Sequence, residues 1–410
     1  MKTACIIVCG FLLVATATAG NGGSAYTMFG IGDLNFSPSV RSAGMGYTGI
    51  ALPSANAINT LVPATWSRIA RVRIDASALY EGINTADASA KLYQAKGLFN
   101  GVHLAIPLSP AHGIVFGAGI IPYSRVAYNT SFSGTQAGVD YRMNEIGSGG
   151  LTKAQVGLSY APFEELAVGA TLNYLFGKRA TERTLIPLSS NVWGGTLFID
   201  EGQSGTNVTL SALFTGLGRV SETLRPFSLG FMLTTRANLS SSLTHRLETL
   251  AEVDTIRLGE RNLTIPIGFG IGAGYQLGER WLFAADYYTQ AWNDARVHGV
   301  PFTNIRNSNR FGIGAEKLPL KDATSWSDKL AYRLGFVYEA TYYRLNGEPI
   351  NMWGATGGIT MPVSGETRLN IGLEYAQRGV QQQPLVRDRF IRVSFALTIA
   401  EPWFIRYEEE

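Results

Sequence analysis

Apolar side chains alternate with glycine, small, polar or charged ones in recurring runs between Val72 and Ile399. The clearest run extends from Tyr332 to Tyr342, where aromatic and aliphatic residues occupy every even position and Arg333, Gly335 and Glu339 lie between them. Only an extended strand separates two such sets onto opposite faces. At about 3.3 Å per residue the run covers about 33 Å, which a tilt of about 40° reduces to roughly 25 Å, the height of the apolar band of an outer-membrane barrel.

Fourteen such strands are predicted along the chain, an even number as single-chain bacterial barrels require. They cover Arg71 to Glu81, Gly101 to Pro107, Ile114 to Tyr128, Leu151 to Pro162, Leu166 to Lys178, Asn207 to Phe214, Phe227 to Arg236, Thr264 to Gln276, Trp281 to Trp292, Asn309 to Lys317, Lys329 to Tyr343, Trp353 to Met361, Thr367 to Gln377 and Arg387 to Ala400. The predicted fold is all-β, a transmembrane antiparallel β-barrel.

The connections between these strands alternate in length. Pro162 to Glu165, Gly278 to Arg280 and Val363 to Glu366 are short enough for periplasmic turns, whereas Arg179 to Asn207 and Ala237 to Asn262 are long enough for external loops. We therefore expect the short turns at one end of the barrel and long loops at the other.

Glycine is abundant, with 47 residues in 410, and many glycines fall on the non-apolar face of a strand. The series Gly268, Gly270, Gly272 and Gly274 shows this face most clearly. Glycine weakens a soluble sheet. Inside a barrel it can line a lumen, relieve curvature, or let a plug approach the wall.

Residues 1–19 have the features of an export signal, with a basic start at Lys2, an apolar stretch, and the small ending Ala17-Thr18-Ala19. Both cysteines, Cys5 and Cys9, lie inside it, so disulfides and thiolate metal sites are not expected after cleavage. A lipid-attachment signal ending at Cys9 is the alternative, although Val8 is bulky for such a site. Residues 20–70 show no sustained period and could form a disordered leader or an internal plug, and the barrel is predicted in residues 71–410.

Composition and motifs argue against several classes of function. The net charge of +3 does not indicate a nucleic-acid partner, and no uninterrupted apolar stretch is long enough for a helical membrane span. The four histidines are His103, His112, His245 and His298, and none lies in a nucleophile motif. We therefore expect no enzyme activity, no cofactor and no metal site. A soluble secreted all-β protein is the alternative to a barrel.

Three segments near the start resemble the FadL-type outer-membrane channels: YTMFGIGDL from Tyr26, RSAGMGYTGIAL from Arg41 and NTLVPATWS from Asn59. The later segments GIGAGYQLGERWLFAADYYTQAW from Gly270 and LNIGLEYAQRG from Leu369 are also similar to that family. The resemblance implies an N-terminal hatch that contains Gly44, Met45, Gly46, Asn59, Pro63 and Ala64. Val62 departs from the pattern, because the family has an asparagine there.

The resemblance further implies an outer-membrane location and passive uptake of hydrophobic compounds, such as long-chain fatty acids, through a plugged lumen. The partners would then be a hydrophobic small molecule and outer-membrane lipids. In the family the wall opens at an inward kink in the third strand, and the third strand here carries Gly117, Gly119 and Pro122. Proline removes a ladder donor, so a lateral opening is predicted near it. The alternative is that Pro122 only ends the membrane portion.

The sequence leaves open the role of the lumen charges and the choice between two functions. Lumen charges such as Arg73, Asp75, Arg333, Glu339, Arg368 and Glu374 could bind a carboxylate head group, but pairing across strands is the favoured role. The alternative function is that of a scaffold or shuttle component of a type IX-type secretion system, with a secretion-machinery partner, since FadL-like barrels also serve there.

Overall fold

The computed structural model describes residues 23–401 except 38, 89, 137, 190–192, 298, 321 and 383–384. The predicted export signal at residues 1–19 and the acidic C-terminal tail lie outside the described residues. Within them, no helix is both long enough and apolar enough to cross a membrane.

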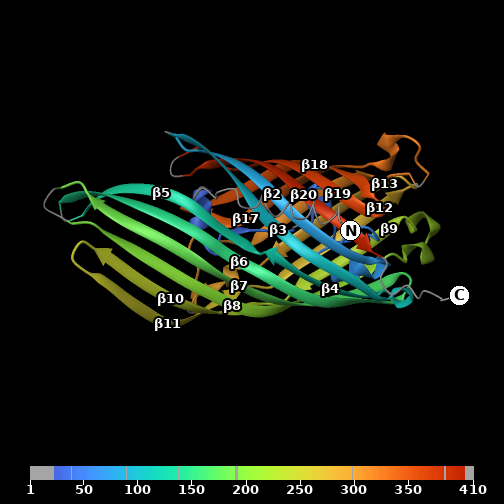
Figure 1. The fold of residues 1–410 in the computed structure, drawn as a ribbon, viewed down its shortest axis with the longest axis horizontal. Helices are drawn as coiled ribbons and strands as arrows, with labels where there is room; N and C mark the ends of the chain where they lie inside the picture. Colours follow the sequence, from blue (N-terminus) through green and yellow to red (C-terminus); the bar gives the residue numbers. More distant parts are fainter. Residues whose placement is uncertain are drawn as a thin grey trace.

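Fourteen antiparallel strands of the described chain form a closed wall (Figure 1). In order around the wall they are β2 (Val72–Ala86), β3 (Lys91–Ser109), β4 (Ile114–Pro122), β6 (Val139–Phe163), β7 (Leu166–Pro187), β8 (Gly195–Phe214), β9 (Phe227–Thr234), β12 (Gly268–Leu277), β13 (Trp281–Gln290), β16 (Ser308–Lys317), β17 (Ala331–Leu345), β18 (Glu348–Ser364), β19 (Thr367–Gly379) and β20 (Arg387–Glu401). Pairing of β2 with β20, from Val72 opposite Glu401 to Ala86 opposite Arg387, closes the ring. The predicted barrel and its strand count are confirmed.

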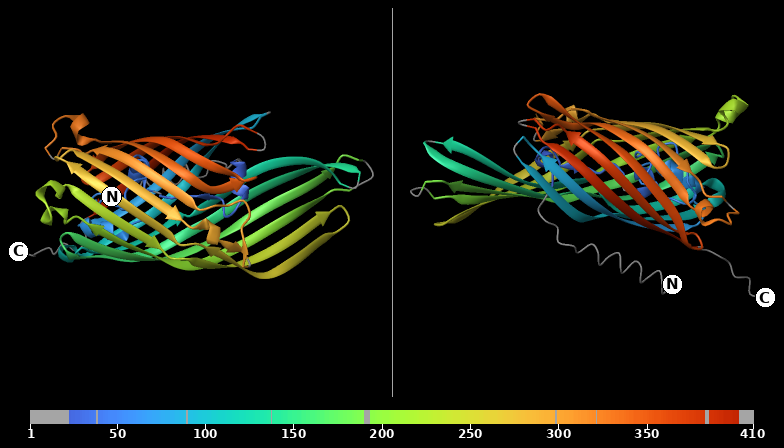
Figure 2. Two further views of the ribbon diagram at one scale, coloured as in Figure 1. Left: turned by 180° about the vertical axis from the view of Figure 1, so that it is seen from behind. Right: turned by 90° about the horizontal axis from the view of Figure 1, so that it is seen from above.

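Six strands continue beyond the closed wall as a sheet that we call the blade (Figures 1 and 2). It consists of β5 (Ser124–Gln136), the distal halves of β6, β7 and β8, and the hairpin of β10 (Ala237–Thr249) and β11 (Val253–Ile265). The external loops predicted for Arg179 to Asn207 and Ala237 to Asn262 are therefore wrong in conformation, because most of both segments is strand. Their side chains alternate less clearly since both faces of the blade are largely free of lipid.

The change of polarity along β7 marks the membrane surface. The outward side chains of Val168, Leu172 and Phe176 are apolar and exposed. The next outward position is Lys178, which forms an ion pair with Asp200 of β8 at 3.0 Å, and Glu182 follows. An apolar surface in contact with lipid thus gives way to a charged surface in contact with water, and the blade lies on the water side.

The opposite end carries the short connections. β6 and β7 are joined at Glu164–Glu165, β12 and β13 at Gly278–Arg280, and β18 and β19 at Gly365–Glu366. The start of β2 and the end of β20 lie at this end as well. The tight turns predicted from sequence are confirmed, and they define the periplasmic end.

The first described segment, residues 24–69, folds inside the wall. It contains η1 (Ala25–Met28), β1 (Asp33–Leu34), α2 (Val40–Ala43) and η2 (Pro63–Arg68). The side chains of Tyr26, Met45 and Trp66 are fully buried. The remaining short elements are η3 (Pro110–His112), η4 (Leu217–Arg219), η5 (Glu222–Leu224), η6 (Trp292–Asp294), β14 (Arg296–Val297), β15 (Val300–Pro301) and η7 (Trp326–Lys329). We call residues 24–69 the hatch.

Candidate functional site: the hatch, the lumen cavities and the wall seam

The turn after α2 lies directly on the wall. A side chain at Gly335 of β17 would collide with the backbone of Met45 and Gly46, and one at Gly314 of β16 would meet Met45. Gly46 itself adopts a left-handed φ of 66°, and its N–H donates to Oγ1 of Thr356 at 2.8 Å. The turn therefore requires glycine twice, in its own backbone and on the wall opposite.

Other parts of the hatch meet wall glycines in the same way. The backbone of Ile50 and Ala51 lies against Gly230 and Gly272, and the ring of Trp66 lies on Gly117. Of the three explanations for inner-face glycines, these contacts support close approach of a plug. Each full burial of a large apolar hatch side chain stabilises this position by about 1.5–3 kcal/mol.

Asn59 organises the segment that leads into η2. Its Nδ2 donates to the carbonyl of Gly49 at 2.7 Å, and its Oδ1 accepts from the N–H of Leu61 at 3.0 Å. Its own carbonyl accepts from Nε1 of Trp66 at 2.6 Å. Asn59 thus connects the hatch segment at Gly49 to the segment that leads into η2.

Pro63 and Ala64 begin η2, and the sequence resemblance places both in the hatch. The N–H of Ala64 donates to Oγ of Ser211 on β8 at 2.9 Å. The backbone of both residues lies against Gly169 of β7. This end of the hatch is therefore bonded to two neighbouring wall strands.

Asp286 of β13 fixes the middle of the hatch and was not identified from the sequence. Its Oδ2 accepts from the N–H groups of Gly49 and Ile50, at 2.6 and 2.8 Å. The side chain is buried, and its other oxygen has no partner among the described residues. A single carboxylate among the apolar and aromatic residues of Trp281–Gln290 is the signal that could have revealed it.

Four of the six lumen charges named from the sequence, Arg73, Arg333, Glu339 and Glu374, form ion pairs, which is the favoured role. Asp75 instead accepts from Oγ1 of Thr398 at 2.6 Å, and among the described residues Arg368 forms no ion pair. Arg333 donates to Glu316 at 2.7 Å, and Arg41 of the hatch donates to the same carboxylate at 2.5 Å. Arg310 bonds Glu339, and Arg73 donates to Glu366 at 3.0 Å. These contacts tie the wall strands to one another and, through Arg41, to the hatch.

A second cluster surrounds Arg392 of β20, which donates to Glu81 at 2.7 Å and to Glu374 at 3.2 Å. The hydroxyl of Tyr47 donates to Glu374 at 2.6 Å. Burial, and next the neighbouring Glu374, raises the pKa of Tyr47 well above its usual value. The phenol therefore remains a donor at every physiological pH.

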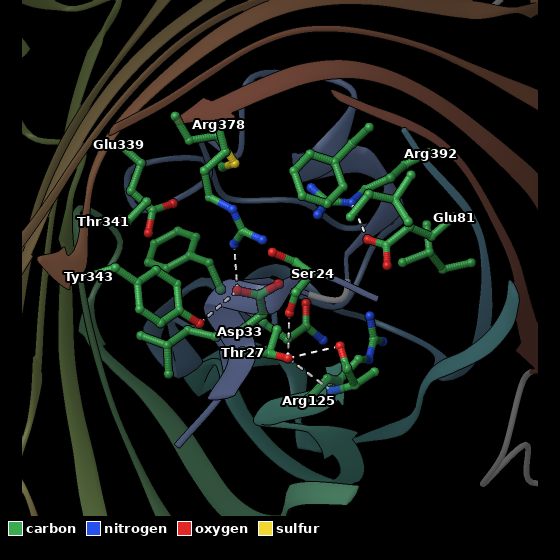
Figure 3. A pocket seen from close by; sticks show the side chains of 18 of the residues that line it. Ser24, Thr27, Asp33, Glu81, Arg125, Glu339, Thr341, Tyr343, Arg378 and Arg392 are labelled. Carbon is green, nitrogen blue, oxygen red and sulfur yellow. Dashed lines mark hydrogen bonds and ion pairs between the residues drawn. The ribbon is translucent and has the colours of Figure 1, made fainter. Parts of the chain in front are cut away.

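The external end of the hatch is held by Arg378 of β19. This guanidinium donates to Asp33 of β1 at 2.5 Å and to Asp388 of β20 at 3.0 Å. Asp388 also accepts from Oγ of Ser24 at 2.5 Å, and Tyr343 donates to Asp33 at 2.8 Å. We call Arg378, Asp33, Asp388 and Ser24 the latch, of which Figure 3 labels Arg378, Asp33 and Ser24.

Two small cavities lie in the lumen next to the latch. The first, of about 90 Å³, is lined by charged residues of β2, β3, β5 and β20 and by apolar residues such as Leu79, Ile83 and Phe390 (Figure 3). The second, of about 70 Å³, is lined by Lys153, Tyr288 and several side-chain amides. Both are well below the roughly 300 Å³ at which ordinary ligand pockets begin.

Hatch residues Leu34, Asn35 and Phe36 line both cavities, as do Arg310 and Glu339 of the wall. The Phe36 ring lies 4.5 Å from the Arg310 guanidinium and 4.9 Å from the Tyr288 ring. Aromatic contacts therefore hold a short hatch segment at the border of both cavities.

The ladder of the wall is interrupted between β3 and β5. β3 pairs with β4 only from Val102 onward, and β5 pairs along its length with β6. Among the described residues, no pairing joins β3 residues 91–100 to β5 residues 126–136, and we call this stretch the seam. Arg125 bridges its base with long hydrogen bonds of 3.3 and 3.4 Å to Phe99 and Asn100.

The three residues singled out for a lateral opening lie on β4, below the seam. Gly117 is covered by Trp66 of the hatch, and Gly119 by the ring of His103. Pro122 is the last residue of β4, and its carbonyl accepts from Nδ2 of Asn35 at 3.1 Å. Immediately after Pro122 the chain stops pairing with β3, and the seam begins at this point.

Comparison with solved structures shows the same fold. The structure of a Pseudomonas aeruginosa FadL homologue aligns with a TM-score of 0.63 and 13% identity over 90% of this chain and 99% of that one. The Ralstonia pickettii toluene transporter TbuX aligns with a TM-score of 0.60 and 15% identity, covering 89% and 98%. The Pseudomonas putida toluene transporter TodX gives 0.59 and 16%, covering 92% and 99%.

The wall and its strand order thus have the closed, fourteen-stranded barrel fold of the FadL homologue and the two toluene transporters, and the predicted fold class is confirmed. A search of curated proteins gives no match. The family model described as BamG matches residues 1–408, so the chain belongs to the BamG family.

Proposed function

We propose that this barrel is a passive channel for small hydrophobic molecules that enter or leave through the seam. One observation carries the proposal: the first lumen cavity touches both sides of the seam, through Lys96 on β3 and through Arg125 and Ala127 on β5. A molecule at this level, at the membrane surface, could move between the lumen and the outside without crossing a hydrogen-bonded ladder.

The chemistry of the cavity indicates an amphipathic ligand. Apolar side chains such as Leu79 and Ile83 suit a hydrophobic body. Arg125 has no carboxylate within ion-pair distance among the described residues and suits an acidic head group. A fatty acid combines both parts. A long acyl chain exceeds the volume of about 90 Å³, so it would need the hatch segment at Phe36 to move.

Cross-linking the seam tests the proposal. Cysteines at Phe99 and Asn129, which are exposed on either side of the seam, would be joined by a cleavable bis-maleimide. Uptake of a fluorescent long-chain fatty acid and of toluene into liposomes would be measured before and after cleavage. We expect at least tenfold slower uptake while the link is intact and recovery after cleavage.

The matched control joins Val156 and Leu172, which are exposed and directly paired on β6 and β7. This link crosses an intact ladder, so uptake should not change. Equal uptake with the seam linked and unlinked would contradict the proposal.

The second candidate function is that of a scaffold component of a secretion system. The blade favours it, because it extends beyond the membrane and exposes apolar side chains such as Phe132, Leu185 and Leu247. Co-purification of a secretion partner with unchanged uptake after cross-linking would favour the scaffold over the channel.

A further inference from the structure

The blade ends in two strands with different edges. Within the described chain, β11 pairs with β10 and meets β14 only at Leu263 and Thr264. β5 pairs with β6 and meets β1 only at Ser124 and Arg125. Each strand therefore leaves most of one edge unpaired in water.

The β11 edge has the features by which proteins prevent strand addition. It carries the charged residues Asp254 and Arg257. Its register with β10 shifts between Ser242 and Thr244, and Gly259 adopts a left-handed φ of 56°. Charge and a bulge together make this edge a poor template for another strand.

The β5 edge has none of these features. From Val126 to Gln136 it contains no charged residue and no proline, and its register with β6 is unbroken from Gly149 to Val139. An uncharged, regular and unpaired edge of this length is uncommon, because it readily accepts another backbone.

The hatch already uses the base of this edge. β1 pairs antiparallel with it, and the hydroxyl of Thr27 bonds both the N–H and the carbonyl of Ala127, at 3.1 and 2.9 Å. Ala127 thus directs its backbone away from β6. Because alternate residues of a strand share this direction, Asn129, Ser131, Ser133 and Thr135 present the next backbone groups to the same free side.

The side chains beside this edge define what could bind there. Thr130 and Phe132 alternate with Asn129, Ser131 and Ser133, so one face of the edge carries an exposed aromatic ring and the other is polar. Phe132 is 43% exposed. An added strand with apolar residues on the first face and polar residues on the second would complete both.

We propose that the β5 edge binds an extended segment of a partner polypeptide by strand addition, antiparallel or parallel to β5. The partner segment contributes backbone hydrogen bonds to residues 129–135 and alternates apolar with polar side chains. Main-chain pairing supplies affinity and the alternate side chains supply selectivity. The binding site is the β5 side of the seam, beyond the first lumen cavity, which β5 lines only with Arg125 and Ala127, and it continues the edge that β1 already occupies.

Random decapeptides displayed on phage, panned against the purified full-length barrel in detergent, test the proposal. Enriched peptides should alternate apolar and polar residues. Bound as synthetic peptides, they should slow amide exchange at Ser131 and Ser133 at least tenfold and leave Thr255 and Arg257 unchanged.

Two variants at the same positions separate backbone from side chain. The double substitution Ser131→Pro and Ser133→Pro removes two N–H groups that face away from β6, so the wall should fold while peptide affinity falls at least tenfold. Ser131→Ala with Ser133→Ala keeps both N–H groups and should bind as the parent does.

Three results would overturn the proposal: no enriched peptide, peptides that bind the proline variant as tightly as the parent, or a dimer of the barrel that the proline variant dissociates. The last result would mean that a second copy of this chain covers the edge.

Discussion

Replacing Arg378 with Met should loosen the external end of the hatch and lower the free energy of unfolding. The side chain is 4% exposed, and its partners Asp33 and Asp388 are 28% and 0% exposed. The substitution leaves both carboxylates without their cation. Removing one partner of a buried pair costs about 3–5 kcal/mol. The guanidinium also lies 5.0–5.6 Å from the rings of Tyr26, Tyr343 and Phe390, contacts whose loss adds to this cost.

Urea unfolding in detergent, followed by heat-modifiable gel mobility, measures the stability. A cysteine at Thr27 reports hatch release by its rate of maleimide labelling, which should rise in the variant. Arg389→Met is the control. The Arg389 side chain is exposed on the adjacent strand, and within the described part of the chain it donates only to the side chain of Gln377, at 3.2 Å. Its effect should stay within about 0.5 kcal/mol.

A second variant isolates the charge. Combining Arg378→Met with Asp33→Asn and Asp388→Asn removes the uncompensated carboxylates and should recover most of the lost stability. The reasoning is refuted if Arg378→Met destabilises no more than Arg389→Met, or if neutralising the two acids recovers nothing.

Four further results are expected. Gly335→Ala should impair assembly, because its methyl group meets the hatch backbone, whereas Gly357→Ala has room and should be silent in a heat-modifiability assay. Asp286→Ala should cost about 1–3 kcal/mol in urea unfolding, since two N–H groups of the hatch lose their acceptor. Phe36→Ala should join the two cavities and raise toluene uptake into liposomes, and an unchanged rate would argue against a barrier there. Burial raises the pKa of Tyr26 from 10.0 to about 12, so stability should fall as pH rises through that interval, and Tyr26→Phe should flatten the fall.

The local alternation of apolar and polar side chains was sufficient to predict most strands of the wall. Alternation such as that of Tyr332 to Tyr342 predicts a strand because side-chain direction depends only on adjacent backbone units. The tight turns at Gly278 and Gly365 were predicted for the same reason. The blade was missed because alternation is visible only where one face meets lipid and the other does not, and beyond Phe176 that contrast ends.

The candidate site also contains some parts that local sequence predicts and others that only the fold brings together. Glycines such as Gly335 and the hatch segment around Met45 were predicted, because both carry local sequence signatures. The latch joins residues far apart in the chain, and no local pattern links Asp33 to Arg378. The seam likewise depends on where β3 and β5 diverge.

By itself, then, the sequence determined that this chain forms an even-stranded barrel, since the period of two and the apolar belt are properties of short segments. The plug was expected only from the family resemblance. Only the tertiary structure decided which charges pair, where the wall ladder breaks and which edge stays free. These depend on register around the closed ring, where one strand's position is set by all the others.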